Sequence, residues 1–594
     1  MDLGRGVAQS GSAPAWGAGG RWFESSHPDH QDVLNLTHQI RFIWITIYIH
    51  RKERLVMRTP LQGQLVPMSP QGPQCFVDWR WVKAGYVGWY SGDTRIGVWD
   101  KAPSNTVSKP HGPFGIRLNA QQAKTIGPIM QRDKPWEYGY HFVYVIYDEG
   151  KYRGWYEGIP ADHFDNSDVT WPTGHGNVLC YAESDDGFNW HKPKLDIFDY
   201  HGDTKTNIVF GRGLNPHGFA VHGSSLFKDP HGPPSERYKL IYQGSSISPN
   251  VDQWIAENKK RFGDEMDPMA LRHGKGQAKL QLGISGRLEK KTGPNTHWIA
   301  GATSPDGLHW TPIPEPLMVH YSDTVNTASW DEQRDRYVGY FRTWRYGRRC
   351  IGRAETEDYR LWPSTPDTVL EAPLESHPSD DIYTNAKVTY PNSSDTHLMF
   401  PAMYHRLGDS REVYLASSED SVNWQWVPGG PIIKKGNLGD WDGGDITACP
   451  GIVPLSNDRI GVPVDAYIHP HKYPRGGEPN FGSAGWATWQ LGRLCAITAD
   501  EYGEFSTPEL VFQGKELSLN LKTLGAGSVK VELRNESGMP IPGHTFTEVD
   551  TFAGDNIDWR VSWLGNSDLR KVANQTISVA FKLQKADLFA FEFK

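Results

Sequence analysis

The chain has 594 residues and a formal net charge of −8, with 61 Lys and Arg against 69 Asp and Glu. This balance gives no basic field of the kind that binds a phosphate backbone, so nucleic acid is excluded as an expected partner. Aromatic residues make up 12% of the chain, beside 62 Gly and 42 Pro. Such a composition favours short strands, tight turns and flat polar ligands over a helical enzyme.

The first 68 residues carry neither hydrophobic periodicity nor helix caps, so we expect a disordered segment or a wrongly assigned start. The stretch GVAQSGSAPAWGAGGRWFESSHPD, from Gly6 to Asp29, resembles the peptide obtained when a bacterial tRNA gene is translated, which moves the start to Met57 or Met68. The apolar run from Ile40 to Ile49 is shorter than the about 20 residues of a membrane span, and no signal-peptide cleavage pattern follows it. We expect a soluble, cytoplasmic protein, with export left open by the uncertain start.

From Tyr140 onward one unit recurs, in which strands alternate with polar turns and the third strand runs into a Ser-x-Asp-Gly-x-x-Trp-like turn. Its copies read YAESDDGFNW (181–190), ATSPDGLHW (302–310), RAETEDYRLW (353–362), LASSEDSVNW (415–424) and a degenerate AITADEYGEF (496–505). The Ser, Thr and Asp side chains cap backbone amides, Gly permits a positive φ, and Trp packs between blades. Five copies predict an all-β fold with a five-bladed β-propeller over residues 69–510.

Two further segments stand outside this repeat. A long polar insertion between Ser245 and Ile299 is either an exposed helix or a solvated loop. After Pro508 the pattern changes to long alternating strands, LSLNLKTL, SVKVELRN, DWRVSWLG and TISVAFKL. These strands predict a C-terminal β-sandwich over residues 511–594, with structural support of the propeller as its expected role.

The repeats and the sandwich resemble the family 32-like glycoside hydrolases and the broader fructosidase and arabinosidase propellers, over about residues 75–594. The resemblance implies a carbohydrate substrate and a glycosidase that removes terminal sugars. The fructosidase motifs Trp-Met-Asn-Asp-Pro, Arg-Asp-Pro and Glu-Cys-Pro are absent, and the nearest strings are PWEYG at Pro135, FKDP at Phe227 and ACPG at Ala448. Two alternatives stay open: a non-catalytic sugar-binding propeller, and a sialidase-like enzyme, whose fold has six blades.

Residues just before the innermost strand of each blade converge at one mouth of a propeller, so the chemistry is expected there. Glycoside hydrolysis needs one carboxyl group as acid and another as nucleophile or base, about 5 to 5.5 Å apart for retention and 6.5 to 9.5 Å for inversion. By the resemblance, Glu137 is the first-blade nucleophile or base, and Asp323 or Asp381 supplies the acid. Acids beside turns are also common caps, so each has a purely structural alternative.

The same positions supply candidates for sugar binding. Trp136, Trp344 and Tyr383 suit stacking on a sugar ring, unless they fill the cores between blades. The candidates for binding sugar hydroxyl groups are His217, His222, Asn326, Asp442 and Asp445.

Four arginines lie in the stretch FRTWRYGRR (341–349), where Arg342 is expected at the channel. A guanidinium group there suits a uronate or a sulfate, although strand alternation sends some of these side chains outward. No ligand spacing supports zinc. The five cysteines lie far apart and are expected to be reduced, buried thiols, so neither a metal nor a cofactor is predicted.

Overall fold

The computed structural model describes residues 72–160, 176–216, 221–247, 295–318, 320, 322–363, 365–473 and 482–594. Contacts divide the chain into Met1–Met57 and Arg58–Lys594, and every described residue lies in the second unit. The expectations for residues 1–68 and for His217 lie outside the described residues, as does most of the insertion after Ser245.

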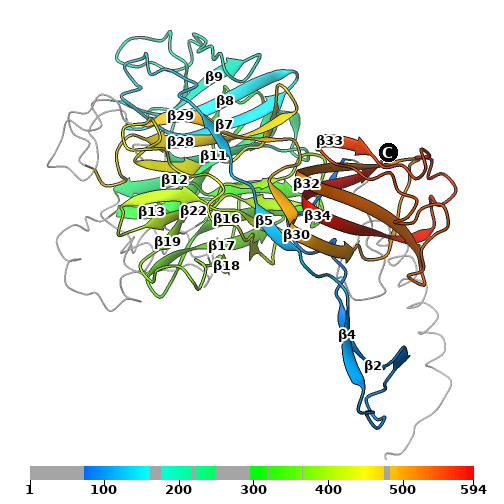
Figure 1. Cartoon of the computed structure of the whole chain (residues 1–594). Helices are drawn as coiled ribbons and strands as arrows, with labels where there is room; N and C mark the ends of the chain where they lie inside the picture. Colours follow the sequence, from blue (N-terminus) through cyan, green and yellow to red (C-terminus); the bar gives the residue numbers. More distant parts are fainter. Residues whose placement is uncertain are drawn as a thin grey trace, which may run out of the picture. The chain divides into compact units, whose positions relative to one another are not determined.

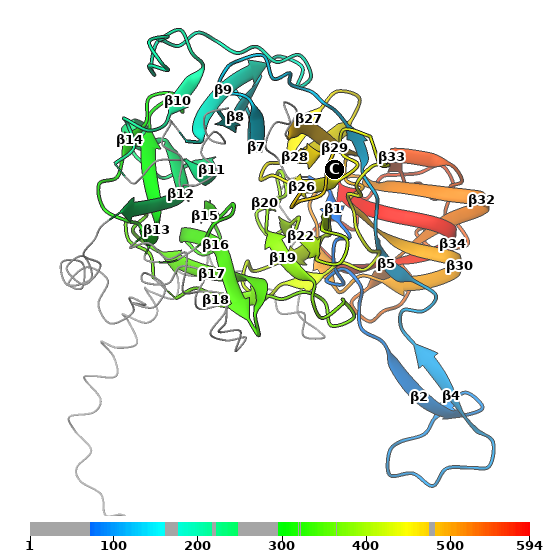
Figure 2. The same cartoon turned by 90° about the vertical axis from the view of Figure 1, so that its left-hand side faces the viewer.

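Five antiparallel blades form a ring, as Figure 2 shows. In each of the first three blades four strands follow one another in chain order from the inside outward. Blade 1 consists of β7 (Gly139–Asp148), β8 (Lys151–Ile159), β9 (Val178–Ser184) and β10 (Ile208–Phe210). Blade 2 consists of β11 (His222–Lys228), β12 (Tyr238–Ile247), β13 (Asn295–Ser304) and β14 (Thr311–Pro312). Blade 3 consists of β15 (Thr327–Asp331), β16 (Arg336–Arg345), β17 (Arg348–Thr356) and β18 (Asp367–Leu370).

The fourth blade is split into two short sheets, because its strands are interrupted part-way along their length. One sheet contains β19 (Asp381–Thr384), β22 (Ala402–His405) and β23 (Ser410–Val413). The other contains β20 (Lys387–Thr389), β21 (His397–Met399), β24 (Ala416–Ser418) and β25 (Gln425–Trp426). The innermost strand of this blade is therefore divided into β19 and β20, with β19 at the end where the strand begins.

The fifth blade closes the ring with a strand from the other end of the propeller sequence. Its members are β26 (Asp445–Ala448), β27 (Val453–Leu455), β28 (Arg459–Tyr467), β29 (Ser483–Gln490) and β6 (Lys124–Ile126). Strand β6 precedes blade 1 in the chain but pairs with β29, as the outermost strand of blade 5. Closing the ring in this way removes an exposed edge between the first and last blades.

The recurring turn has the predicted hydrogen bonds in four blades. In blade 2 the Ser304 hydroxyl accepts the Gly307 amide at 2.9 Å, and Asp306 accepts the amides of Leu308 and His309 at 2.8 and 2.9 Å. The Trp310 indole then donates to the Gly307 carbonyl at 3.0 Å. Gly187 and Gly307 have φ values of 79° and 77°, so the need for a positive φ is confirmed.

Each of these turns is also bound by a neighbouring blade. The Trp155 indole of blade 1 donates to the Gly307 carbonyl of blade 2 at 2.7 Å. Trp486 of blade 5 donates in the same way to Gly187 of blade 1 at 2.8 Å, and thereby joins the two ends of the ring. The tryptophans of the turns themselves pack between blades, as predicted: Trp310 lies among buried residues of blades 1 and 2, and Trp362 among those of blades 2 and 3.

Residues after the fifth blade form a β-sandwich with strands contributed by both ends of the described chain (Figure 1). Its strands are β1 (Gln74–Cys75), β5 (Arg117–Ala120), β30 (Cys495–Ser506), β31 (Leu510–Val511), β32 (Leu517–Asn535), β33 (Asp555–Arg560) and β34 (Thr576–Phe593). Register shifts interrupt the long β30, β32 and β34 pairings. Such bulges bend a strand, so one pair of strands can serve both layers of a sandwich.

The prediction that residues 496–505 form the turn of a fifth blade is wrong. Residues 496–505 lie within β30, which pairs with β34 and β5 of the sandwich and forms no turn of a blade. The segment before residue 510 thus joins the C-terminal sheet, whereas the expected propeller ended there. The fifth blade is made instead by β26 to β29 with β6, so the number of five blades is nevertheless confirmed.

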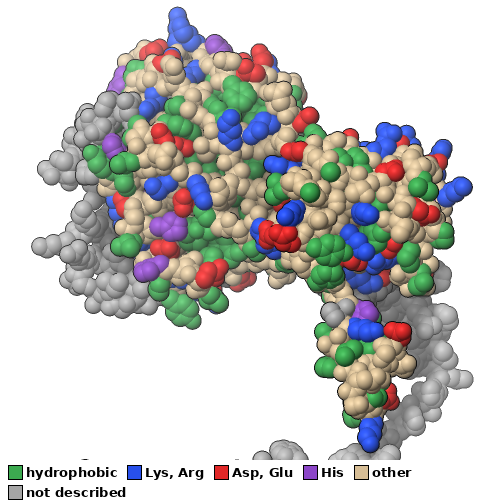
Figure 3. Space-filling view, viewed as in Figure 1, with side chains coloured by type: hydrophobic (Ala, Val, Ile, Leu, Met, Phe, Trp, Pro, Cys, Tyr) green, Lys and Arg blue, Asp and Glu red, His purple; other side chains and the backbone are tan. Residues whose placement is uncertain are grey.

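A separate hairpin lies between β1 and β5. It consists of β2 (Tyr86–Ser91), β3 (Thr94–Arg95) and β4 (Thr106–His111), which pair only with one another. Trp89 and Trp99 are exposed on it, and Figure 3 shows hydrophobic side chains over its surface.

Helical structure is almost absent from the described part of the chain. The element Pro234–Glu236 is a single turn of 3-10 helix. Within the ranges given above, no helix has the length and apolarity of a membrane span. All five cysteines are buried and unpaired by disulfides, as expected.

Candidate active site at the heads of the blades

Charged side chains meet where the innermost strands of the blades begin. We call this region the blade heads; it contains His222, Asp323, Asp381 and Asp445, which open or precede the inner strands of blades 2 to 5. Contacts between neighbouring blades join these four residues, whereas the candidates from blade 1, Glu137 and Trp136, lie elsewhere.

Arg342 on β16 connects blade 3 to blade 4. Its guanidinium group is ion-paired with Asp323 and donates from Nη2 to the Tyr383 carbonyl at 2.7 Å. Asn326 lies in the loop before β15 and donates to the Thr324 carbonyl at 3.0 Å. Asn326 therefore shapes the loop that holds Asp323, while Asp323 keeps 22% of its side chain exposed.

Blade 3 also supplies arginines to the head of blade 4. Arg349 donates from Nη1 to both carboxylate oxygens of Asp381, at 3.2 and 3.0 Å. Arg406, which follows β22 of blade 4 itself, donates to the same carboxylate at 2.6 Å, so two guanidinium groups share one buried acid. Arg348 donates from Nε to the carbonyl of Asp380 at 2.6 Å.

A buried ion pair links blade 4 to blade 5. Arg411 donates its backbone amide to Asp445 at 2.7 Å and its Nε to the two carboxylate oxygens at 2.9 and 2.8 Å. Burial by itself lowers the pKa of Arg411, but the charge and hydrogen bonds of Asp445 raise it above the ordinary value. The charged form of Arg411 is therefore favoured by its acid, whereas burial raises the pKa of Asp445 above its ordinary value despite the arginine.

Tyr383 lies at the centre of these pairs. The guanidinium carbons of Arg342, Arg349 and Arg411 lie 4.8, 5.1 and 4.6 Å from the centre of its ring. The His471 ring lies edge-on to it, with ring centres 4.8 Å apart. Three cations around one aromatic ring are fixed by cation–π attraction as well as by their acids.

Blades 1 and 2 contribute a carboxylate and a histidine. The fully buried carboxylate of Glu157, on β8, accepts hydrogen bonds from the backbone amide and the hydroxyl group of Ser224 at 2.8 and 3.0 Å. It also accepts one from the side-chain amide of Asn177 at 3.1 Å. Its Oε2 lies 3.2 Å from Nδ1 of His222. Burial lowers the pKa of His222, but Glu157 and then Asp323 raise it above 6.5 overall.

The structure places Glu137 and Trp136 away from this group, inside blade 1. The Glu137 carboxylate is fully buried and accepts hydrogen bonds from Tyr156 at 2.6 Å and from Lys192 at 2.7 Å. Trp136 donates to Asn207 at 2.9 Å. Glu137 therefore holds a loop against its own blade, because it precedes β7 on the side of the outer strands.

The remaining predicted residues divide between the two locations. Trp344 lies beside the blade heads, where the Arg349 guanidinium carbon is 5.3 Å from its ring centre. Asp442 instead lies beside Thr125 of β6, in the outer part of blade 5, and burial raises its pKa.

Sequence reasoning missed Glu157, Arg406 and Arg411. Glu157 is the one charged residue in the run GWYEGI at the end of β8, which is a usable signal because strands rarely bury an unpaired acid. No local signal marked Arg406 or Arg411, because their partners are distant in sequence. Asp381 precedes Arg406 by 25 residues, and Asp445 follows Arg411 by 34 residues.

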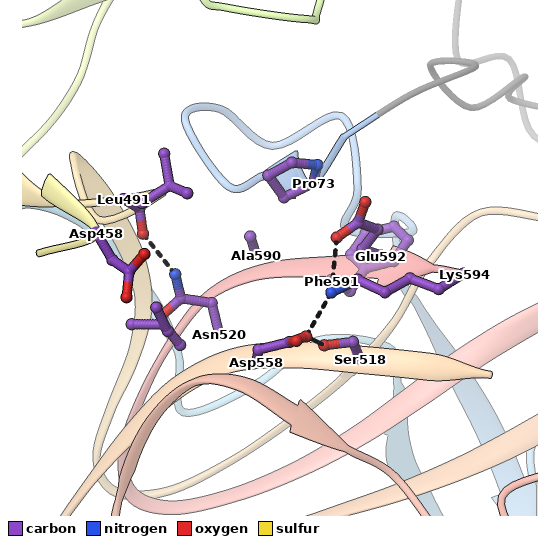
Figure 4. Close-up of a pocket in the computed structure, with 11 residues that line it drawn as sticks. Pro73, Asp458, Leu491, Ser518, Asn520, Asp558, Ala590, Phe591, Glu592 and Lys594 are labelled. Atoms are coloured by element: carbon purple, nitrogen blue, oxygen red, sulfur yellow. Dashed lines mark hydrogen bonds and ion pairs between the residues drawn. The ribbon is translucent and has the colours of Figure 1, made fainter. Parts of the chain in front are cut away.

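A pocket of about 240 Å³ lies elsewhere, between the edge of blade 5 and the sandwich (Figure 4). Lys594 bridges Asp558 and Glu592 there at 2.5 and 3.4 Å, and Asn520 donates to the Leu491 carbonyl at 2.7 Å. The charges of Asp558, Glu592 and Lys594 are thus paired with one another, and no predicted site residue lines the pocket. Elsewhere in the described chain, too, no cluster of three or more potential metal ligands is found.

No protein-family model matches the chain, and no curated protein matches it in sequence. Similar solved structures include a glycoside hydrolase family 43 arabinoxylan arabinofuranohydrolase from Bacillus subtilis, 11% identical with a TM-score of 0.34, covering 78% of this chain and 96% of its own. A GH32 β-fructofuranosidase from Bombyx mori is 9% identical with a TM-score of 0.34, over 78% and 95%.

An N-acetylgalactosamine deacetylase from F. plautii is 12% identical with a TM-score of 0.39, over 64% of this chain and 97% of its own. All three TM-scores lie below 0.5, so these neighbours say nothing about the substrate of this chain.

Proposed function

We propose that the chain is a glycoside hydrolase whose reacting groups are Asp323 and His222, with Glu157 positioning the histidine. The observation that supports this most directly is the meeting of these three residues with Arg342 at the heads of blades 1 to 3. Glycoside cleavage needs a group that gives a proton to the leaving oxygen and a second that acts as nucleophile or base.

Asp323 suits the role of nucleophile or base. The adjacent Arg342 favours its ionised form, and the side chain is partly exposed, so a substrate can reach it. His222 suits the role of proton donor, because its raised pKa keeps it protonated at higher pH than an ordinary histidine. Asp381, shared by Arg349 and Arg406, is assigned to holding arginines.

The test is hydrolysis of a panel of nitrophenyl glycosides and oligosaccharides by the full chain and its variants. Asp323→Asn is expected to lower kcat/KM by about 10²- to 10⁴-fold, the usual contribution of such a group. Glu157→Gln is expected to move the alkaline limb of the pH profile to lower pH, because it removes the charge that raises the His222 pKa. Asp185→Asn is the matched control, because Asp185 is an exposed acid in blade 1 and its replacement is expected to leave turnover unchanged.

Glu137→Gln distinguishes the two first-blade acids. If the variant folds, its turnover is expected to match the parent, since the Glu137 carboxylate is buried among its own blade. Full activity of Asp323→Asn, or loss of turnover in folded Glu137→Gln alone, would refute the assignment.

One observation favours a second candidate, a non-catalytic sugar-binding propeller. The acids of blades 3 to 5 at the heads, Asp323, Asp381 and Asp445, each form an ion pair with an arginine. Pairing with an arginine disfavours the protonated form that a carboxylic acid needs as proton donor, although burial outweighs this effect for Asp445 and raises its pKa. Sugar binding by the parent without turnover of any substrate in the panel supports this candidate. The six-bladed, sialidase-like alternative is not supported by the five described blades.

A further inference from the structure

The head of blade 4 holds more guanidinium groups than its acids require. Arg349 and Arg406 share the single carboxylate of Asp381. Arg348 is bonded to a backbone carbonyl, that of Asp380, whose own carboxylate lies 2.9 Å from Nδ1 of His405. Asp380 and Asp381 thus lie beside three arginines and a histidine, while a third acid nearby, Asp409, accepts hydrogen bonds from Tyr404 and from the backbone amide of Lys472.

At the head of blade 4 the acidic side chains are more deeply buried than the basic ones. The side chain of Asp381 is fully buried, whereas 41% of Arg406 and 18% of Arg349 is exposed. His405 is partly exposed as well. Because the acids lie beneath and the cations above, a ligand approaching this head meets guanidinium groups first.

Several of these guanidinium groups have hydrogen atoms without an acceptor. Within the described residues, Nη2 of Arg348 and Nε of Arg349 are buried and make no hydrogen bond, and the same holds for Nε of Arg342. Buried donors are nearly always satisfied, by the protein, by water or by a ligand. An oxyanion satisfies such donors well, because its hydrogen bonds to a guanidinium group are charge-assisted.

From this layering, the unpartnered Nη2 of Arg348 and the exposed side chain of Arg406, we propose that the blade 4 head binds the acidic group of the substrate sugar, with these two arginines as its ligands. The class of ligand is a sugar that carries a carboxylate or a sulfate ester. Both residues contact the same dipeptide, Asp380-Asp381: Arg348 through the carbonyl of Asp380 and Arg406 through the carboxylate of Asp381. The sugar part of this inference rests on the proposed function; the anion part rests on the arginines alone.

The test measures binding by calorimetry, in the full chain carrying Asp323→Asn to prevent turnover. The probes are glucuronate, galacturonate, galactose 6-sulfate, neutral glucose and galactose, and inorganic sulfate. At least one acidic sugar is expected to bind at least about tenfold more tightly than its neutral counterpart, since a bidentate guanidinium contact gives roughly that discrimination. Comparing uronates with the sulfated sugar distinguishes the two acidic groups.

Arg348→Gln and Arg406→Gln are expected to abolish this preference, and Arg348→Lys to restore part of it. Arg345→Gln is the matched control, because Arg345 lies at the end of β16, close to Arg348 in sequence, but is exposed and paired with Glu371. Thermal melting verifies that each variant folds.

Equal binding of acidic and neutral sugars, or no binding of any acidic sugar at millimolar concentration, would overturn the proposal. So would an equal loss in Arg345→Gln, or binding of inorganic sulfate as tight as that of the acidic sugars. If unmutated protein hydrolyses nothing while the acidic sugars still bind selectively, the proposed reaction fails and this inference stands.

Discussion

Two arginine–aspartate pairs with similar geometry but different burial permit a direct measurement of what burial does. In the Arg411–Asp445 pair the side chains are 4% and 0% exposed, and in the Arg117–Asp500 pair they are 49% and 71% exposed. Both pairs include a 2.9 Å hydrogen bond from Nε to a carboxylate oxygen. We expect Asp445→Asn to lower the free energy of unfolding by about 3 to 5 kcal/mol, because it leaves a buried guanidinium charge without its acid.

Asp500→Asn is expected to cost less than about 1 kcal/mol, since both groups are solvated and the pair is screened. The two variants therefore differ by about 3 kcal/mol, or more than a hundredfold in the unfolding equilibrium constant. Urea unfolding followed by tryptophan fluorescence measures both values, at low and at high salt.

Salt is expected to reduce the small effect of Asp500→Asn and to leave that of Asp445→Asn nearly unchanged. A loss below about 1 kcal/mol for Asp445→Asn would refute the reasoning, as would equal losses in the two variants. Either result would mean that the buried pair is solvated or already broken.

Three further predictions concern the turns and the histidine. Ser304→Ala removes the fully buried acceptor of the Gly307 amide, and an unfolding measurement should show a loss of about 1 to 2 kcal/mol. Gly307→Ala places a Cβ 2.6 Å from Cζ2 of Trp155 at a φ of +77° and is expected to lower the melting temperature. Ser421 has a φ of 60° in the turn of blade 4, so the expected cost is the steric contact with Trp155. A melting temperature no lower than that of the parent would contradict this steric cost. The raised pKa of His222 gives stability that is fully present below pH 6.5 and is lost as pH rises through the folded-state pKa, so His222→Gln should remove this decline; an unchanged pH dependence of stability would show that the pair with Glu157 does not form.

The sequence by itself determined the architecture because the blade turn is built from local contacts. Ser, Asp, Gly and Trp within seven residues satisfy one another, so every true copy of the motif marks the same place in a blade. The fifth copy was a wrong prediction for the opposite reason. Residues 496–505 have a sequence similar to the repeat, but their strand, β30, pairs with β34, which is distant in sequence. Pairing between distant strands decided that assignment.

The site was determined in part by sequence and in part by tertiary structure. The positions of Asp323, Asp381 and Asp445 could be predicted because residues before inner strands converge in any propeller, and Arg342 was a candidate because it lies in the arginine-rich stretch 341–349. The choice between Glu137 and Glu157 depended on which side of blade 1 each carboxylate faces, and the arginine partners depended on contacts between blades that are distant in sequence. A pattern of residue types records which groups are present, whereas burial and pairing across blades, which set charge and accessibility, arise only when the ring closes.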